Sequence, residues 1–203
     1  MERGGVAGVR RALGSADTWA VGWRDTWRYV AGVAGCLLLG WFAFVRGTRV
    51  PLLGLADLGF HELGHMLTFV LPDLATAMAG SVTQVLVPLG LAAYFLWWRR
   101  DDLGAGLCLA WAGTSAADVA VYVADAPYEA LPLIGGHHDW AYVLGRLGAI
   151  DAAAGIASGV RVAGGLMLLA GIGVCVLGLV RSDRKDAPYN REAASEWRNW
   201  QTR

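Results

Sequence analysis

Phe60-His61-Glu62-Leu63-Gly64-His65 stands near the middle of an apolar segment, residues 50–71, and this stretch decides how the chain is interpreted. Residues four apart on an α-helix lie one turn above each other, about 40° apart around the axis. His61 and His65 can therefore offer two imidazole nitrogens to one metal ion, with Glu62 on the flank of the same site. Two histidine ligands, a glutamate and an open coordination position are typical of a catalytic zinc site.

Long apolar runs dominate the chain and predict a membrane protein. The 203 residues are 56% hydrophobic with a mean hydropathy of +0.43, and 17% are charged, against about a quarter in soluble domains. A run of about 20 such residues is enough to cross a hydrocarbon core of ~30 Å. We predict an all-α, polytopic transmembrane helical bundle with five spans, at residues 29–45, 50–71, 74–98, 103–124 and 162–180.

The total number of crossings depends on one further segment. Residues 141–159 are rich in glycine and alanine, and their sequence leaves open whether they span. Both tails are Arg-rich, so the positive-inside rule places both in the cytoplasm and requires an even number of spans. We favour 141–159 as a sixth, short segment; the alternative is that residues 74–98, which contain Pro88, dip into the membrane and return. The expected parts are an interfacial N-terminal segment 1–28, a metal-binding bundle 29–180 and a polar cytoplasmic tail 181–203.

Charge and cysteine content exclude several functions. The net charge is zero, so nothing electrostatic favours nucleic acid as a partner. The three cysteines, Cys36, Cys108 and Cys175, fall in apolar runs without a CxxC pair, which argues against a disulfide framework or a cysteine-ligated zinc. The expected surroundings are the lipid bilayer and other membrane proteins or peptides.

Membrane depth strengthens the HExxH pattern. His61 and His65 are each about 15 Å or less from either end of the 50–71 segment, at ~1.5 Å per residue. Ionisable side chains deep in a bilayer are costly, so a cluster of them indicates function. The alternative is that His61, Glu62 and His65 are buried polar residues whose partners lie on neighbouring helices.

The third metal ligand is expected from the loop at residues 126–140. This loop holds His137 and His138, followed by Asp139, so all four histidines of the chain fall in two clusters. A catalytic zinc site with two helical histidines needs a third protein ligand, and Asp139 and His138 are the candidates. The alternative is an ordinary solvated loop.

Two further carboxylates are candidates for supporting roles. Asp57 lies one turn before His61 and could accept the free N–H of that ring; otherwise it is a carboxylate favoured near a helix start. Asp118 lies inside the 103–124 segment, where a carboxylate needs a partner, either the metal site or Arg146. Gln84 either faces the metal or bonds a neighbouring helix.

The motif resembles the site-2 protease class of intramembrane zinc metallopeptidases, in its divergent bacterial branch. The resemblance rests on Phe60–His65 within a membrane helix and on a later segment that contains Asp. It implies His61, His65 and a distant aspartate as zinc ligands, Glu62 as catalytic base, and a bacterial or archaeal plasma membrane. The Asp-Gly that usually carries the third ligand in this class is missing, so Asp139 would replace it, with His138 as ligand or support and Asp118 in reserve.

Three functions follow from these observations. The first is an intramembrane zinc protease that hydrolyses peptide bonds of membrane-embedded substrates. The second is a metal-binding membrane protein without hydrolysis, either with a structural zinc or on a path for metal ions or protons. The third is a subunit of a larger membrane assembly or oligomer, suggested by the glycine-rich helices.

Overall fold

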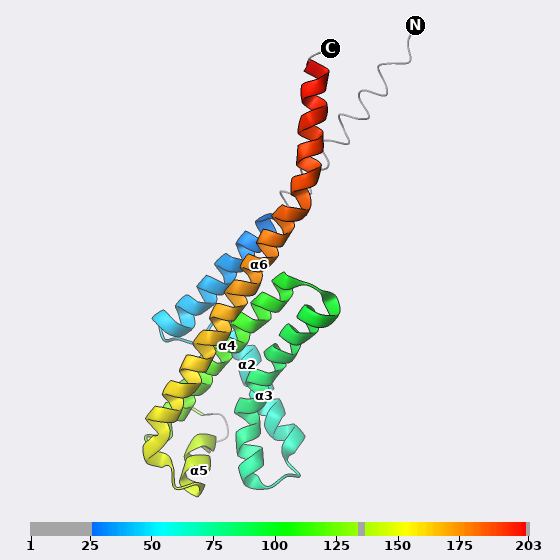
Figure 1. Cartoon of the computed structure of the whole chain (residues 1–203). Helices are drawn as coiled ribbons and strands as arrows, with labels where there is room; N and C mark the ends of the chain where they lie inside the picture. The colour runs from blue at the N-terminus through cyan, green and yellow to red at the C-terminus, as the bar shows by residue number, and fades with distance from the viewer. Residues whose placement is uncertain (1–25, 134–136, 202–203) are drawn as a thin grey trace.

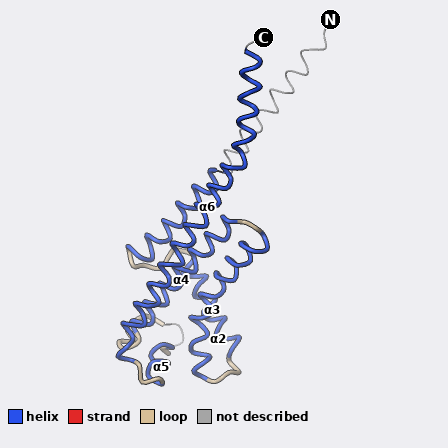
Figure 2. Tube along the Cα trace, viewed as in Figure 1, coloured by secondary structure: helices blue, strands red, loops and turns tan. Residues whose placement is uncertain are grey.

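The computed structural model describes residues 26–133 and 137–201, with side chains up to Ser182, and all regular structure in these ranges is helical (Figures 1 and 2). A first helix, Thr26–Val45, ends in the π-helical turn η1 (Trp41–Val45). The other elements are α2 (Leu53–Thr68), α3 (Asp73–Ala93), η2 (Tyr94–Arg99), α4 (Asp102–Asp125), α5 (Asp139–Arg146), η3 (Ile150–Ala152) and α6 (Ala153–Gln201).

Four helices of the described part are long and apolar enough to cross a membrane, which agrees with the predicted α-helical membrane protein. They are Thr26–Val45, Asp73–Arg99, Asp102–Asp125 and Ile150–Ser182. The third predicted span is one continuous helix through Pro88 and does not dip and return.

The predicted count of five spans and a sixth segment is not confirmed. α2 has 16 residues, about 24 Å of helix against a hydrocarbon core of ~30 Å. Residues 141–159 are divided between the eight-residue α5, the turn η3 and the start of α6. Of the N-terminal segment expected at 1–28, residues 1–25 lie outside the described part. At the other end, helix α6 continues into the predicted polar tail as far as Gln201.

Small residues let α4 and α6 pack with their backbones in contact (Figure 1). A Cβ atom added to Gly171 would lie 2.5 Å from the carbonyl oxygen of Gly106, and one added to Gly113 would lie 2.5 Å from that of Gly164. Steps of seven residues separate the two glycines on each helix, so they form one stripe per helix. Lipid supplies little hydrophobic drive for helix association, and such close contacts are what holds membrane helices together.

The first helix lies antiparallel to α6 on the same side of the bundle. Gly40 packs against Leu168, and Gly178 packs against Tyr29. Near the end of the first helix, the Arg161 guanidinium donates to the carbonyl oxygens of Ala43 (3.4 Å) and Phe44 (3.1 Å). These carbonyls belong to the last turn of a helix, where intrahelical donors run out.

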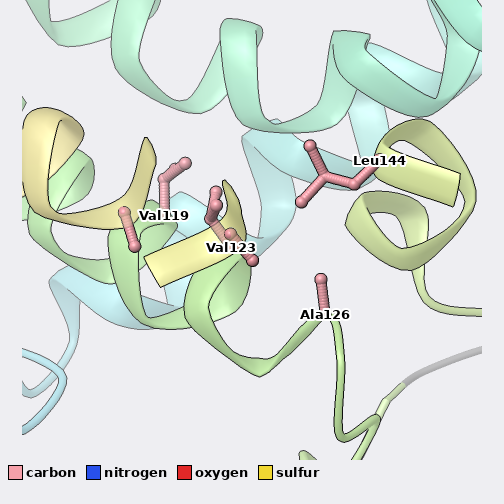
Figure 3. Packing of buried hydrophobic residues seen from close by; sticks show 6 residues of the cluster. Val119, Val123, Ala126 and Leu144 are labelled. Carbon is pink, nitrogen blue, oxygen red and sulfur yellow. The ribbon is translucent and has the colours of Figure 1, made fainter. Parts of the chain in front are cut away.

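A buried apolar cluster fixes the short helix α5 against the ends of α4 and α6 (Figure 3). Leu144 of α5 is 2% exposed and packs with the last turns of α4. The members of the cluster are Val119, Val123, Ala126, Leu144, Ala153 and Ala157. Because α5 begins at Asp139, this packing also sets the position of that carboxylate.

The glycine stripe predicts a strong position dependence of stability on α6. Gly171→Ala should lower the free energy of unfolding by about 1–3 kcal/mol, because the new methyl group would press on the α4 backbone. Gly173→Ala is the matched control, since a Cβ there meets no atom within 4 Å. Thermal unfolding of the detergent-solubilised protein, followed by tryptophan fluorescence, measures both. Equal effects of the two substitutions would contradict the close packing.

Candidate metal centre

Two glycines bring α2 and α3 together at the HExxH segment. A Cβ on Gly64 would lie 2.5 Å from the carbonyl oxygen of Ala79 on α3. A Cβ on Gly80 would lie 2.6 Å from the Nε2 atoms of both His61 and His65. The backbone of α3 therefore forms one wall of the site, and the two imidazole rings occupy the space that a side chain at position 80 would need.

Asp139 completes a group of three metal-ligating side chains. Its Oδ2 atom lies 3.1 Å from His61 Nε2 and 3.2 Å from His65 Nε2. The three ligand atoms all lie within 4.8 Å of one another, in a group that could hold a metal ion. The first turn of α5 thus delivers the carboxylate to the two histidines of α2, as the loop at 126–140 led us to expect.

The outer nitrogens of both rings face hydrogen-bond acceptors. His65 Nδ1 lies 2.9 Å from the carbonyl oxygen of Thr76, and His61 Nδ1 lies 3.3 Å from Gln84 Oε1. A carbonyl oxygen can only accept, so each Nδ1 carries a proton and each neutral ring presents a lone pair at Nε2. Two such lone pairs facing a carboxylate oxygen repel each other unless a cation lies between them. The donor set therefore fits a metal ion, with the outer hydrogen bonds that metal-bound histidines normally make.

The surroundings keep Asp139 ionised. Burial raises the pKa of its carboxyl, but with no metal bound and both imidazoles protonated, the hydrogen bond from His61 and the charges of His65 and His61 lower it more, so the pKa lies below its ordinary value. The Tyr122 hydroxyl donates to Oδ2 (3.2 Å) and accepts from the Asp139 backbone N–H (3.0 Å). Both the charge and the orientation of the carboxylate suit it to bind a cation.

A cavity of about 1190 Å³ opens beside the three ligands. The side chain of Glu62 is exposed and lines this cavity. The carboxylates on the lining are Asp57, Glu62, Asp73, Asp118, Glu129 and Asp139. The same cavity therefore exposes both the ligand group and the motif glutamate.

The ligands lie nearer to one end of the bundle than the sequence led us to expect. Gly80 is about 10 Å from the start of α3, and Tyr122 is about 5 Å from the end of α4, at ~1.5 Å per residue. α2 itself ends at Thr68, one turn beyond His65. The site is thus at the end of the bundle where α3 begins and α4 ends.

His138 does not join the ligand group. Its Nδ1 accepts the N–H of Ala141 and caps α5, and its ring stacks on Tyr122 with the centroids 4.3 Å apart. Its Nε2 lies 3.3 Å from Asp125 Oδ2, outside good hydrogen-bond geometry. The neighbouring His137 lines the cavity.

The two supporting carboxylates face partners other than those we expected. Asp57 is 4% exposed and accepts from Trp111 Nε1 (2.8 Å) and Ser115 Oγ (2.7 Å), so it turns toward α4. Gln84, rather than Asp57, meets the Nδ1 of His61. Asp118 lies outside the ligand group and pairs with Arg49 (2.8 Å) instead of Arg146.

Sequence reasoning missed Gly80 and Tyr122 as parts of the site. Tyr122 had a signal, because it is one turn after Asp118 on the face of α4 that carries polar groups. Gly80 had none, since its role depends on which residue of α3 lies opposite the HExxH turn.

Comparisons of the chain with protein-family models, with curated proteins and with solved structures gave no match.

Metal analysis of ligand variants tests the group. Wild-type protein should contain about one metal ion per chain, and both His61→Ala and Asp139→Ala should lose it, because two remaining ligands hold zinc weakly. Glu129→Ala should keep the metal, since this exposed cavity carboxylate lies outside the group. Elemental analysis of the purified proteins gives the metal and its amount. Unchanged content in His61→Ala would contradict the site.

A pair of glycine variants tests the α3 wall. Gly80→Ala should reduce metal content several-fold, because the methyl group would displace both Nε2 atoms. Gly90→Ala, on the same helix, is the control, as a Cβ there meets nothing within 4 Å. Equal metal content in the two variants would show that the two imidazoles do not need a residue without a side chain at position 80.

Proposed function

We propose that the chain is an intramembrane zinc metalloprotease that hydrolyses peptide bonds of membrane-embedded substrates. The observation that carries this proposal is the convergence of two imidazole Nε2 atoms and one carboxylate oxygen beside a cavity that Glu62 also lines. Three protein ligands with an accessible remaining side are typical of catalytic zinc, whereas structural zinc is closed by four.

The donor set supports zinc over the hard cations. Imidazole nitrogen suits zinc, while calcium and magnesium prefer sites built from oxygen alone. When bound, Zn²⁺ would act as a Lewis acid on the substrate carbonyl and lower the pKa of water toward about 7. His61, His65 and Asp139 would hold it.

Glu62 has the place and the chemistry of a general base. It follows the ligand His61 directly and is exposed on the lining of the cavity beside the ligands. Its carboxylate would accept the proton of the water that attacks the peptide carbonyl and pass it to the leaving amine. Such proton transfers typically contribute 10²–10⁴-fold to the rate.

A membrane-embedded substrate agrees with the surroundings of the site. α2 is too short to span, and its start lies deeper in the bundle than its end: Asp57 meets Ser115 of α4, whereas Thr68 meets Thr76 in the first turn of α3. Large apolar side chains are exposed along it, including Leu55, Met66 and Leu67, as expected for contact with lipid or an apolar segment. If both tails are cytoplasmic, the ligands lie toward the opposite side of the membrane.

A metal-binding role without hydrolysis is the second candidate. The observation in its favour is the acidic lining of the cavity, which would attract cations. In that case the metal would be cargo or structural, and Glu62 would have no part in bond cleavage.

The Glu62→Gln variant separates the two functions. It should keep its metal, because Glu62 is outside the ligand group, and lose about 10²–10⁴-fold in cleavage rate. Vesicles that hold the purified protein together with single-span membrane proteins provide the assay, and mass spectrometry of new N-termini measures cleavage. Glu129→Gln, another exposed cavity carboxylate, is the control. Wild-type rates in Glu62→Gln would refute the catalytic role.

A further inference from the structure

A line of polar side chains connects the loop before α2 to the ligand His61. Arg49 Nε donates to Asp118 Oδ1 at 2.8 Å, and Gln84 Nε2 donates to Asp118 Oδ2 at 3.3 Å. Gln84 Oε1 then lies 3.3 Å from His61 Nδ1. The four residues come from four separate parts of the chain, so the contact is built by the tertiary fold.

The surroundings of Gln84 allow its amide one orientation. Its nitrogen lies near two groups that can only accept, Asp118 Oδ2 and the carbonyl oxygen of Ser115 at 3.5 Å. Rotating the amide by 180° would place its oxygen against both of them. Gln84 is 4% exposed, so water does not offer an alternative partner. The amide oxygen therefore faces His61.

This orientation decides which nitrogen of His61 is free. An amide oxygen accepts the Nδ1 proton and leaves the Nε2 lone pair directed at Asp139, whereas an amide nitrogen would require the opposite tautomer. His65 does not depend on a side chain in this way, because its Nδ1 faces the backbone oxygen of Thr76. A side-chain amide thus orients His61, whereas a backbone carbonyl orients His65.

We propose that Gln84 is the positioning residue for the ligand His61, and that Asp118, paired with Arg49, fixes the Gln84 amide in the orientation that metal binding needs. The inference rests on the metal site of the proposed function. Gln84 acts through His61 and does not itself meet the metal. Arg49 donates to the other oxygen of Asp118 and so holds that carboxylate in place beside Gln84.

The first test removes the acceptor. Gln84→Leu should weaken Zn²⁺ binding about 10–100-fold, the usual effect of removing an outer partner of a metal-bound histidine. Competition with a chelator, on the full chain in detergent, gives the dissociation constant. The visible absorption of the Co²⁺-loaded protein should also change, because His61 would no longer be held in one orientation.

The second test exchanges the two groups. In the double variant Gln84→Glu/Asp118→Asn, the carboxylate at position 84 accepts from His61 and the amide at position 118 donates to it. The oxygen of the same amide accepts from Arg49. The total charge is unchanged because the carboxylate gained at position 84 replaces the one lost at position 118. Zn²⁺ affinity should return to within about threefold of wild type, well above that of Gln84→Leu.

A control and the wild type keep the outcomes distinct. Thr114→Val removes a buried hydroxyl that bonds within α4 and should leave affinity and the Co²⁺ spectrum unchanged. If wild type binds Zn²⁺ but Gln84→Leu matches it in affinity and spectrum, the positioning role is overturned while the metal site stands. Failure of the exchanged double variant to recover affinity also overturns it. If wild type binds no metal, the proposed function fails, and this inference with it.

Discussion

The packing of α4 against α6 is the constraint on which the rest of the structure depends. One face of α4 is made of small residues and lies against the α6 backbone. The opposite face carries Trp111, Ser115, Asp118, Tyr122 and Asp125 at heptad spacing, and each bonds or lies beside a polar group of another segment. If α4 rotated, the glycine contacts and the polar contacts would be lost together. Inside a membrane no water is available to replace the lost polar contacts, and lipid does not restore the close glycine packing.

The polar face of α4 also explains how α2 and α5 keep their places. Neither has the length of a span, so the bilayer alone does not orient them. Asp57 ties α2 to α4, and Tyr122 ties the start of α5 to the same helix. Hydrogen bonds between membrane helices contribute about 0.6 kcal/mol on average, so several are needed. The residues that hold α2 and α5 in place are therefore also those that surround the ligands.

Much of the site followed from local sequence, and the exceptions have physical causes. The i, i+4 spacing of His61 and His65 was enough to predict the histidine pair, and the loop at 126–140 narrowed the third ligand to Asp139 or His138, with Asp118 in reserve; the structure brings Asp139 to the pair. The span count was not confirmed because residues 50–71 are as apolar as a span, whereas helix α2 has only 16 residues, and composition does not give the length of a helix. Asp57 turned toward α4, and Gln84, for which the sequence had left two roles open, met His61. The rotation of α2 relative to α3 and α4 selects these partners, and contacts at Gly64 and Gly80 set that rotation.

The bare backbone at Gly80 also determines how molecules can move through the site. Because α3 closes the ligands on that side without a side chain that could swing aside, the cavity beside Glu62 is the side from which they are reached. Under the proposed function, a peptide and its products would both pass through this cavity. Turnover would then be strictly sequential, with the departure of one set of products required before the next substrate can reach the metal.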